Sequence, residues 1–284
     1  MQSTIGKIIV RIFYLFGLHI FFRKKIQNRY GSILFFHTCD KKVFERTIKY
    51  FKKNYNIVSF NNLIDIIQNN KYISNEKPYL TITFDDGLKS NYHLLETIIK
   101  YDIDPTIFLV PHYIESEDQF WWNILDNKST FNKLINMDDS KRLNQLGQIN
   151  NKSKKRDSLK KEEIHRMKKN VNFQSHSFSH PILTTCDDNK LEDELIESKL
   201  YLEKLLDTKV DIFAYPNGNY GLREILYLKK TGYKSAVTIN HGFVKKNSNL
   251  FELNRINVGR GSNYIETIVC ASGVYGQLKM FFKR

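Results

Sequence analysis

One stretch of the chain strongly limits its fold: an apolar run over residues 79–84 is followed directly by Asp85, Asp86 and Gly87. A short apolar run with polar residues at its end is typical of a buried strand, and the glycine allows a positive φ where the chain turns away. Two adjacent carboxylates repel each other unless a cation or a proton neutralises one of them. The stretch therefore predicts a buried strand that ends in a metal site or in a shared proton.

A second stretch supplies the ligands that a metal ion would need. His176 and His180 are four residues apart and can face one point if the chain coils through a single turn. One carboxylate and two imidazoles leave a coordination position open for water, which is typical of catalytic rather than structural zinc. The same ligand types also suit cobalt, nickel or manganese. The alternative is a pair of histidines in a polar loop without a metal.

The order of four motifs resembles that of the polysaccharide deacetylases, the NodB-like carbohydrate esterases. The runs Thr-Phe-Asp-Asp-Gly (83–87) and His-Ser-Phe-Ser-His (176–180) are similar to the first two motifs of that family. Ala-Tyr-Pro-Asn-Gly (214–218) resembles the third motif, and Gly-Tyr-Lys-Ser-Ala (232–236) resembles the strand that follows it. The resemblance covers roughly residues 32–260. It implies an α/β fold, a distorted (β/α) barrel of about seven parallel strands.

We expect Asp86, His176 and His180 to hold a divalent cation, with zinc favoured by the ligand types. The cation would polarise an amide carbonyl and lower the pKa of a bound water, which acts as the nucleophile. Asp85 would accept the proton of that water as general base. The resemblance implies that the backbone N–H of Tyr215 stabilises the tetrahedral intermediate, and that Pro216 rigidifies its loop.

Three further site residues are predicted, each with an alternative. His37 follows a strand candidate at 32–36, and many family members have a histidine there; a structural histidine is the alternative. Arg255 is expected to replace an arginine that many members carry before the third motif and that is missing here; the alternative is a surface salt bridge. Trp121 borders the cleft or simply anchors an insertion. The general acid is unassigned, because His241 does not match the family's last motif, and His37 is the other candidate.

The chain is expected to divide into an N-terminal segment, 1–30, and a deacetylase domain, 31–284, with an insertion at 112–160. Strands are predicted at 32–36, 57–60, 79–84, 105–110, 171–175, 210–215, 233–238 and 251–258. Helices are predicted at 40–53, from an N-cap at Asn61, and at 88–101, 161–169, 189–206 and 222–231. The insertion is polar and weakly periodic, which favours a lid or a wall that contacts substrate.

Residues 8–22 form the most apolar run of the chain. The run is shorter than the ~20 residues of a spanning helix, contains Arg11 and His19, and is followed by no small-residue cleavage site. It favours a helix in the membrane interface, with the basic residues 23–25 at lipid headgroups. The alternative is a helix packed on its own barrel.

The 41% hydrophobic and 13% aromatic residues exclude a disordered chain, whereas the formal net charge of +14 favours an anionic partner. The lysines are scattered and no nucleic-acid module is recognisable, so we expect no nucleic-acid partner and favour anionic lipid or a phosphorylated carrier. Cys39, Cys186 and Cys270 are odd in number and widely spaced, which fits a reducing compartment. We therefore expect a cytoplasmic protein, peripheral on the inner membrane; export stays open, because many relatives act outside the cytoplasm.

The leading hypothesis is a metal-dependent N-deacetylase that acts on N-acetylated sugars of a surface polysaccharide or glycolipid. The partner would be an N-acetylated carbohydrate, either soluble or lipid-linked. O-deacetylation is a variant of the same chemistry. The competing classes are a catalytically inactive carbohydrate-binding protein on the same fold and a basic membrane adaptor. The pair Asp85 and Asp86 argues against a pure binder, which has no need of two adjacent acids.

Overall fold

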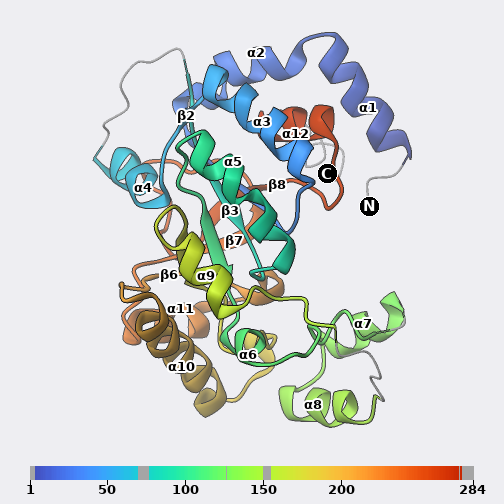
Figure 1. The fold of residues 1–284 in the computed structure, drawn as a ribbon, viewed down its shortest axis with the longest axis vertical. Helices are drawn as coiled ribbons and strands as arrows, with labels where there is room; N and C mark the ends of the chain where they lie inside the picture. Colours follow the sequence, from blue (N-terminus) through green and yellow to red (C-terminus); the bar gives the residue numbers. More distant parts are fainter. Residues whose placement is uncertain (1–3, 70–76, 126, 150–154, 275, 277–284) are drawn as a thin grey trace.

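A closed barrel of parallel strands forms the centre of the molecule (Figure 1). The structure, a computed structural model, describes residues 4–69, 77–125, 127–149, 155–274 and 276. The strand order is β1-β8-β7-β6-β5-β4-β3, and β1 pairs with β3 to close a ring of seven. A short strand, β2, pairs with the first half of β3. The bounds are β1 Gly31–Phe36, β2 Asn56–Ile57, β3 Tyr79–Phe84, β4 Thr106–Leu109, β5 Asn172–Ser175, β6 Ile212–Ala214, β7 Ser235–His241 and β8 Leu253–Asn257. The predicted fold is confirmed.

Strands β1, β3, β4 and β6 are largely apolar on both faces because the barrel interior and the surrounding helices bury both. In β1, Ile33 packs inside the barrel with Phe108 and Leu253, whereas Leu34 and Phe36 belong to the cluster under the helices. Successive strand residues point to opposite faces, so strands of this kind are nearly continuous apolar runs. This explains why the sequence shows runs instead of polar-apolar alternation.

The helices surround the barrel, and two of their starts differ from the predictions. Ser59, rather than Asn61, caps α4, because its Oγ accepts a hydrogen bond from the Asn62 N–H. The segment after β3 begins as a 3₁₀ helix over Lys89–Leu94 and becomes α5 only at Leu95. The bounds are α3 Lys41–Asn54, α4 Phe60–Gln68, α5 Leu95–Lys100, α9 Lys161–Met167, α10 Asp188–Leu206, α11 Leu222–Lys230 and α12 Tyr264–Ala271.

The N-terminal segment is two helices and not one. Helix α1 spans Thr4–Leu15 and α2 spans Leu18–Lys25, with Gly17 at φ 65° between them. One stripe of α1 packs on the domain, because Val10 is buried against Val269 and Val274 beside α12. In the part of the chain that the structure describes, no helix is long and apolar enough to cross a membrane.

The insertion carries three short helices, α6 Pro111–Glu115, α7 Lys128–Leu134 and α8 Asp139–Gly147. Figure 1 shows α7 and α8 at one end of the molecule, away from α1 and α2. An isolated bridge between Leu88 and Ser158 ties the end of the insertion to the loop after β3. The insertion is therefore attached beside the carboxyl end of β3, where the two acidic residues lie.

Candidate metal centre

Asp85 and Asp86 continue directly from β3 at the carboxyl end of the barrel. The Asp85 N–H still donates to the carbonyl of Phe36 (2.9 Å), so Asp85 extends the strand pairing by one residue. Asp86 then turns the chain at φ 71°, and Gly87 follows at φ 62°. A side chain at Gly87 would bring its Cβ to 2.5 Å from Leu109 Cδ2. A glycine is thus required for the turn that presents both carboxylates.

The two histidines leave the end of β5 on a tight coil. The His176 N–H donates to the carbonyl of Leu109, and the His180 N–H donates to the Ser177 hydroxyl at 3.1 Å. Ser177 and His180 have φ values of 63° and 58°, a region that non-glycine residues occupy only when their surroundings stabilise it. This coil brings His180 back towards His176, as the predicted single turn requires.

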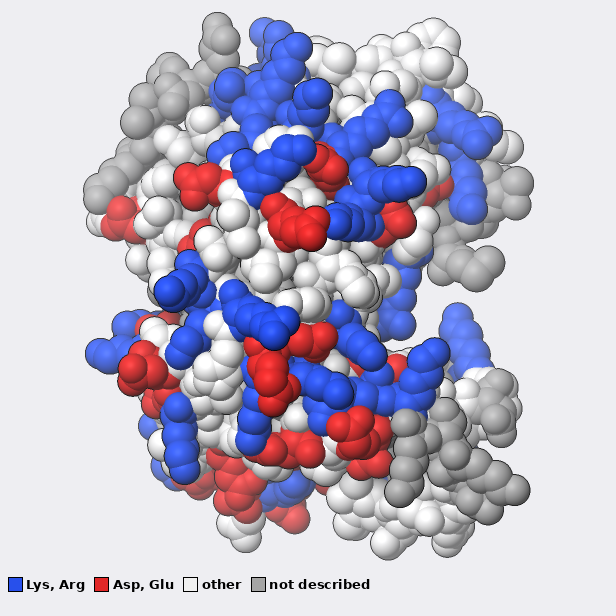
Figure 2. Space-filling view, viewed as in Figure 1, with Lys and Arg blue, Asp and Glu red and all other residues white. Residues whose placement is uncertain are grey.

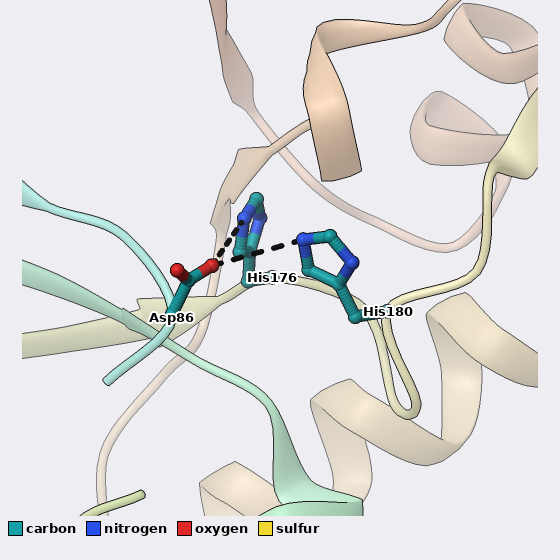
Figure 3. Close-up of side chains that lie close together, drawn as sticks. All are labelled: Asp86, His176 and His180. Carbon is teal, nitrogen blue, oxygen red and sulfur yellow. Dashed lines mark ion pairs between the residues drawn. The ribbon is translucent and has the colours of Figure 1, made fainter. Parts of the chain in front are cut away.

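Asp86, His176 and His180 bring their side chains to one point (Figure 3). His176 Nε2 lies 3.6 Å and His180 Nε2 lies 3.7 Å from Asp86 Oδ1. One ligand atom from each residue lies within 4.8 Å of the other two, and all three residues are buried. The cluster combines one carboxylate and two imidazoles, a donor set that suits a divalent transition metal.

The ring hydrogen bond of His176 and the neutral state of both histidines fit a metal ion. His176 Nδ1 lies 2.7 Å from the carbonyl of Ala214, so Nδ1 carries the proton and donates it. The lone pair of His176 Nε2 then faces Asp86, the tautomer that metal-ligating histidines adopt. Burial lowers the pKa of His176, and burial together with His176 lowers that of His180, so both rings are neutral at pH 7.

Asp85 is held by Arg255, which reaches across the barrel from β8. Arg255 NH1 and NH2 each lie 2.7 Å from a different carboxylate oxygen of Asp85. Arg255 Nε donates to the carbonyl of Thr238, and the guanidinium lies 4.2 Å from the Phe35 ring centroid. Arg255 is fully buried, so the alternative of a surface salt bridge is wrong.

The two neighbouring acids have opposite electrostatic surroundings. Burial favours the neutral acid, but the charge and hydrogen bonds of Arg255 outweigh burial and hold the pKa of Asp85 at about 2. Burial and the Asp85 charge raise the pKa of Asp86 to about 7. Asp85 is therefore ionised at pH 7, whereas Asp86 is only partly ionised unless a cation stabilises its charge.

A pocket of about 260 Å³ opens over these residues, and its lining contains every predicted site residue except Arg255 and Pro216. His37 lies in this lining, with Nε2 4.0 Å from Asp86 Oδ2, and burial lowers its pKa to about 4. His241 is not in the lining. Arg260 was not predicted as a site residue, yet its Nη2 lies 3.5 Å from Asp86 Oδ2 on a half-exposed side chain. The only signal in the sequence that could have indicated Arg260 is its closeness to Arg255 on β8.

Tyr215 lies at the pocket wall, but its backbone donor is already used. Its N–H donates to the carbonyl of Val237 at 3.3 Å, and its hydroxyl donates to the carbonyl of Phe251. The hydrogen bond from the N–H is long, so little free energy would be lost if a ligand oxygen replaced Val237. Pro216 begins the 3₁₀ turn Pro216–Gly218 directly after Tyr215.

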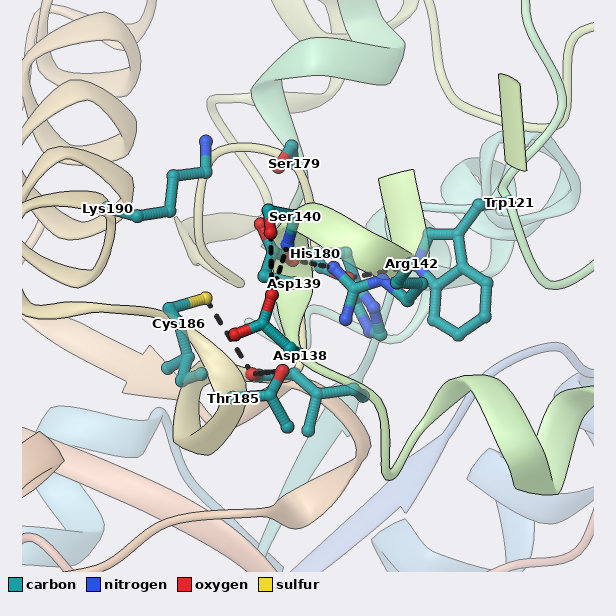
Figure 4. Close-up of polar contacts among 12 residues, drawn as sticks. Trp121, Asp138, Asp139, Ser140, Arg142, Ser179, His180, Thr185, Cys186 and Lys190 are labelled. Carbon is teal, nitrogen blue, oxygen red and sulfur yellow. Dashed lines mark hydrogen bonds and ion pairs between the residues drawn. The ribbon is translucent and has the colours of Figure 1, made fainter. Parts of the chain in front are cut away.

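The two tryptophans connect the insertion to a metal ligand. Trp121 Nε1 donates to the backbone carbonyl of His180 at 3.0 Å, and the Trp122 ring centroid lies 4.2 Å from that of His180. On the other side of Trp121 lies the guanidinium of Arg142 from α8, 5.3 Å from the ring centroid (Figure 4). Trp121 therefore both borders the pocket and anchors the insertion.

Glu194 of α10 holds the residue before His180. The fully buried Glu194 carboxylate accepts hydrogen bonds from the Ser179 N–H (2.8 Å) and the Ser179 hydroxyl (2.5 Å). Lys190, which reaches towards the same loop in Figure 4, forms an ion pair with Glu194 at 2.8 Å. These contacts fix the backbone of the coil that carries His180. The sequence analysis missed Glu194, because a glutamate within a long amphipathic helix carries no signal of such a contact.

Comparison with known proteins agrees with this geometry. The profile of the polysaccharide deacetylase family matches residues 73–236, more than half of the chain. A Bacillus subtilis relative, YxkH, whose name places it among the polysaccharide deacetylases, is 24% identical over 194 residues, 66% of this chain. The match covers 56% of that relative's own length.

Several solved structures share the fold. The deacetylase PplD of Streptococcus pyogenes, solved with acetate, has a TM-score of 0.63 at 19% identity, over 84% of this chain and 96% of that one. BC0361 of Bacillus cereus, a polysaccharide deacetylase, has a TM-score of 0.63 at 20% identity, over 85% and 69%. IcaB of Ammonifex degensii has a TM-score of 0.63 at 15% identity, over 87% and 98%.

Proposed function

Because this chain belongs to the polysaccharide deacetylase family, we propose that it is a metal-dependent hydrolase that removes N-acetyl groups from N-acetylated sugars of a surface polysaccharide or glycolipid. The observation that carries the proposal is the pairing of two differently charged acids at one strand end. The charge of Arg255 keeps Asp85 ionised, and Asp86 faces two neutral imidazoles. A carbohydrate-binding protein gains nothing from such a pair.

The metal would be held by Asp86, His176 and His180, which fit it by donor type, and His176 fits it also by its tautomer. When bound, a divalent cation acidifies water and polarises a carbonyl oxygen. We favour zinc because of the two imidazoles, and the same residues also suit cobalt, nickel or manganese. The fold holds these three buried side chains together in the wall of the pocket.

Asp85 is assigned the general base. Its low pKa keeps the carboxylate ionised, and each oxygen retains a lone pair beyond the one that Arg255 occupies. Arg255 fixes the plane of the carboxylate, so one oxygen can accept the proton of an attacking water without a change of rotamer. Arg255 is thus a positioning residue in this proposal.

His37 is assigned the proton transfer to the leaving amine. It is the histidine in the described lining of the pocket that is not a proposed metal ligand. Its low pKa keeps it neutral at pH 7, so it would take up the proton that Asp85 has accepted from water and pass it to the amine as the C–N bond breaks. Tyr215, Pro216 and Trp121 form the proposed sugar-binding wall, and the Tyr215 N–H is the proposed donor to the amide oxygen.

The products would be acetate and a sugar with a free amine. The acetate bound to the related deacetylase PplD supports this product. The proposed compartment is the cytoplasm at the inner membrane, and the free thiols of Cys39, Cys186 and Cys270 support it.

The test is acetate release from N-acetylglucosamine oligomers by the metal-loaded protein, with the chelator-treated protein and Asp85→Asn as controls. We expect release by the loaded wild type alone. Release from O-acetylated but not N-acetylated oligomers would assign O-deacetylation instead. Binding of the oligomers without release, in wild type and Asp85→Asn alike, would favour the inactive carbohydrate-binding protein.

A further inference from the structure

Helices α1 and α2 expose an unusual amount of apolar surface. Of the fourteen large apolar side chains that are exposed in the described chain, eight lie on these helices and the link between them, and six are spread over five other elements. The eight are Ile8, Ile9, Ile12, Leu15, Phe16, Leu18, Ile20 and Phe21. We call them the apolar face. Concentrated exposed patches of this kind mark interaction sites.

The apolar face is distinct from the side of α1 that packs on the domain. Val10 lies on the packed side, fully buried against Val269 and Val274. Leu15 and Phe16 on the other side remain 78% and 77% exposed. Helix α1 is therefore apolar on two sides and has a partner on only one. An exposed apolar side is costly in water and indicates contact with a further apolar phase.

The charge around the apolar face has one sign. No Asp or Glu precedes Asp40 in the sequence, whereas the same stretch contains six basic residues, Lys7, Arg11, Arg23, Lys24, Lys25 and Arg29. Figure 2 shows Lys and Arg but no acidic side chain over α1 and α2 on this side, in contrast to the mixed charges over α9 and α10. Apolar side chains combined with basic residues fit the interface of an anionic bilayer.

A basic groove of about 380 Å³ adjoins α1, between α1, α3 and α12. Its cations are Arg11, Lys42 and Arg46, and within the described residues Arg11 and Lys42 form no ion pair. Arg46 lies over the ring of Tyr264, 4.0 Å from its centroid. The one carboxylate in the lining, Glu266, accepts a hydrogen bond from the Asn263 N–H. The groove therefore has a surplus of positive charge available to a phosphate.

The basic groove and the candidate metal centre lie at the same end of the barrel. The groove is lined by the first turns of α3 and α12, which follow the carboxyl ends of β1 and β8. Arg260 in the wall of the metal-centre pocket is followed closely by Asn263 in the groove. Any ligand surface that binds along the basic groove therefore lies next to the pocket of the metal centre.

We propose that the apolar face and the basic groove together form a docking site for the surface of an anionic phospholipid bilayer. The exposed side chains of α1 and α2 enter the boundary between headgroups and acyl chains, and Arg11, Lys42 and Arg46 contact lipid phosphates. Docking in this way holds the carboxyl end of the barrel at the membrane. The corollary that a membrane-held glycan is the substrate rests on the proposed function, whereas the docking itself does not.

The test is co-sedimentation of the full chain with vesicles, either of phosphatidylcholine alone or of phosphatidylcholine mixed with phosphatidylglycerol. We expect binding to the mixed vesicles only. Leu15→Glu with Phe16→Glu should weaken it by about a hundredfold, because two anchors become charged. Arg11→Gln with Lys42→Gln should weaken it by about thirtyfold and reduce its dependence on salt. The matched controls, Leu200→Glu on α10 and Lys169→Gln with Lys204→Gln, should bind as wild type does.

A second readout does not require loss of binding. Fluorescence of Phe16→Trp should be quenched by lipids with brominated acyl chains, in excess of the quenching of the native tryptophans and of Leu200→Trp. Equal binding to neutral vesicles, wild-type binding by both double variants, or no binding at all would overturn the proposal. A dimer that Phe16→Glu dissociates, with no vesicle binding, would overturn it as well and assign the apolar face to a second copy of the chain. None of these outcomes depends on acetate release.

Discussion

The carboxyl end of the barrel and the surface of α1 and α2 place side chains in opposite environments. At the barrel end, the charged residues Asp85, Asp86 and Arg255 are at most 3% exposed. On the helices, Leu15 and Phe16 are more than three-quarters exposed. Both arrangements cost free energy in the isolated chain, so each indicates a missing ligand: a cation in the first region and, by our proposal, a lipid surface in the second.

The two regions differ in how precisely they are built. Each nitrogen group of the Arg255 guanidinium has a partner at hydrogen-bond distance, and Glu194 holds Ser179 through both its N–H and its hydroxyl. To bind a lipid surface, the apolar face needs only exposed apolar area and nearby charges of one sign, without exact positions. Single substitutions should therefore change function strongly at the barrel end, whereas substitutions in the apolar face should hardly change stability.

The largest effect is expected from Asp85→Asn. The amide cannot accept the proton of water as a carboxylate does, so kcat should fall by about a thousandfold. The proposed metal ligands are untouched, and metal content should stay at the wild-type level. Acetate release and elemental analysis of the same preparation measure both quantities. Wild-type activity in this variant would remove Asp85 from the mechanism.

Arg255→Met should be the most destabilising substitution. It leaves the Asp85 carboxylate buried without a partner, which costs about 3–5 kcal/mol in the free energy of unfolding. Urea unfolding measures this cost. The double variant Arg255→Met with Asp85→Asn should be more stable than Arg255→Met alone, because no unpaired charge remains. Equal stability of the two would show that the charge of Asp85 is not the reason for the loss.

Glu194→Gln should have an intermediate effect. The amide group of glutamine can accept only one of the two hydrogen bonds from Ser179, so the coil that carries His180 loosens. Metal affinity should fall by about tenfold, as for other residues that orient a metal ligand. Competition with a chromogenic chelator measures the affinity, and excess metal should restore activity. A change in kcat at saturating metal with no change in affinity would contradict the positioning role.

The smallest effect on stability is expected from Leu15→Ser with Phe16→Ser. These side chains make little contact with the domain, so the free energy of unfolding should change by no more than about 0.5 kcal/mol. A loss of several kcal/mol in urea unfolding would show that the apolar face packs within the protein. That result would remove the contrast between the two regions.

Much of the fold could be predicted because several strands, β3 among them, are largely apolar on both faces. The run at 79–84 becomes β3 residue for residue, and the helices predicted at 40–53 and 189–206 become α3 and α10 within one residue at each end. The break at Gly17 was missed, because the apolar pattern continues across it and only the backbone shows the positive φ. Helix α12 was also missed, since its eight residues are nearly all buried and show no polar side.

The ligand triad could be predicted because the carboxyl ends of parallel strands meet at one end of a barrel, and because an acid pair and two histidines at such ends together indicate a metal. The partners that orient it come from distant segments and leave no local pattern. Glu194 lies on a helix face that looks solvent-exposed in the sequence, and Arg142 reaches Trp121 from within the insertion. The pairing of Arg255 with Asp85 depends on the strand order β1-β8, which spacing alone does not give.

The most direct test of the metal centre is elemental analysis of divalent metal in the purified protein, with His176→Ala and His180→Ala as variants and His165→Ala as a control on the exposed side of α9. The account predicts about one equivalent in wild type and in the control, and loss from both site variants. Wild-type protein that takes up no zinc, cobalt, nickel or manganese on dialysis would contradict it.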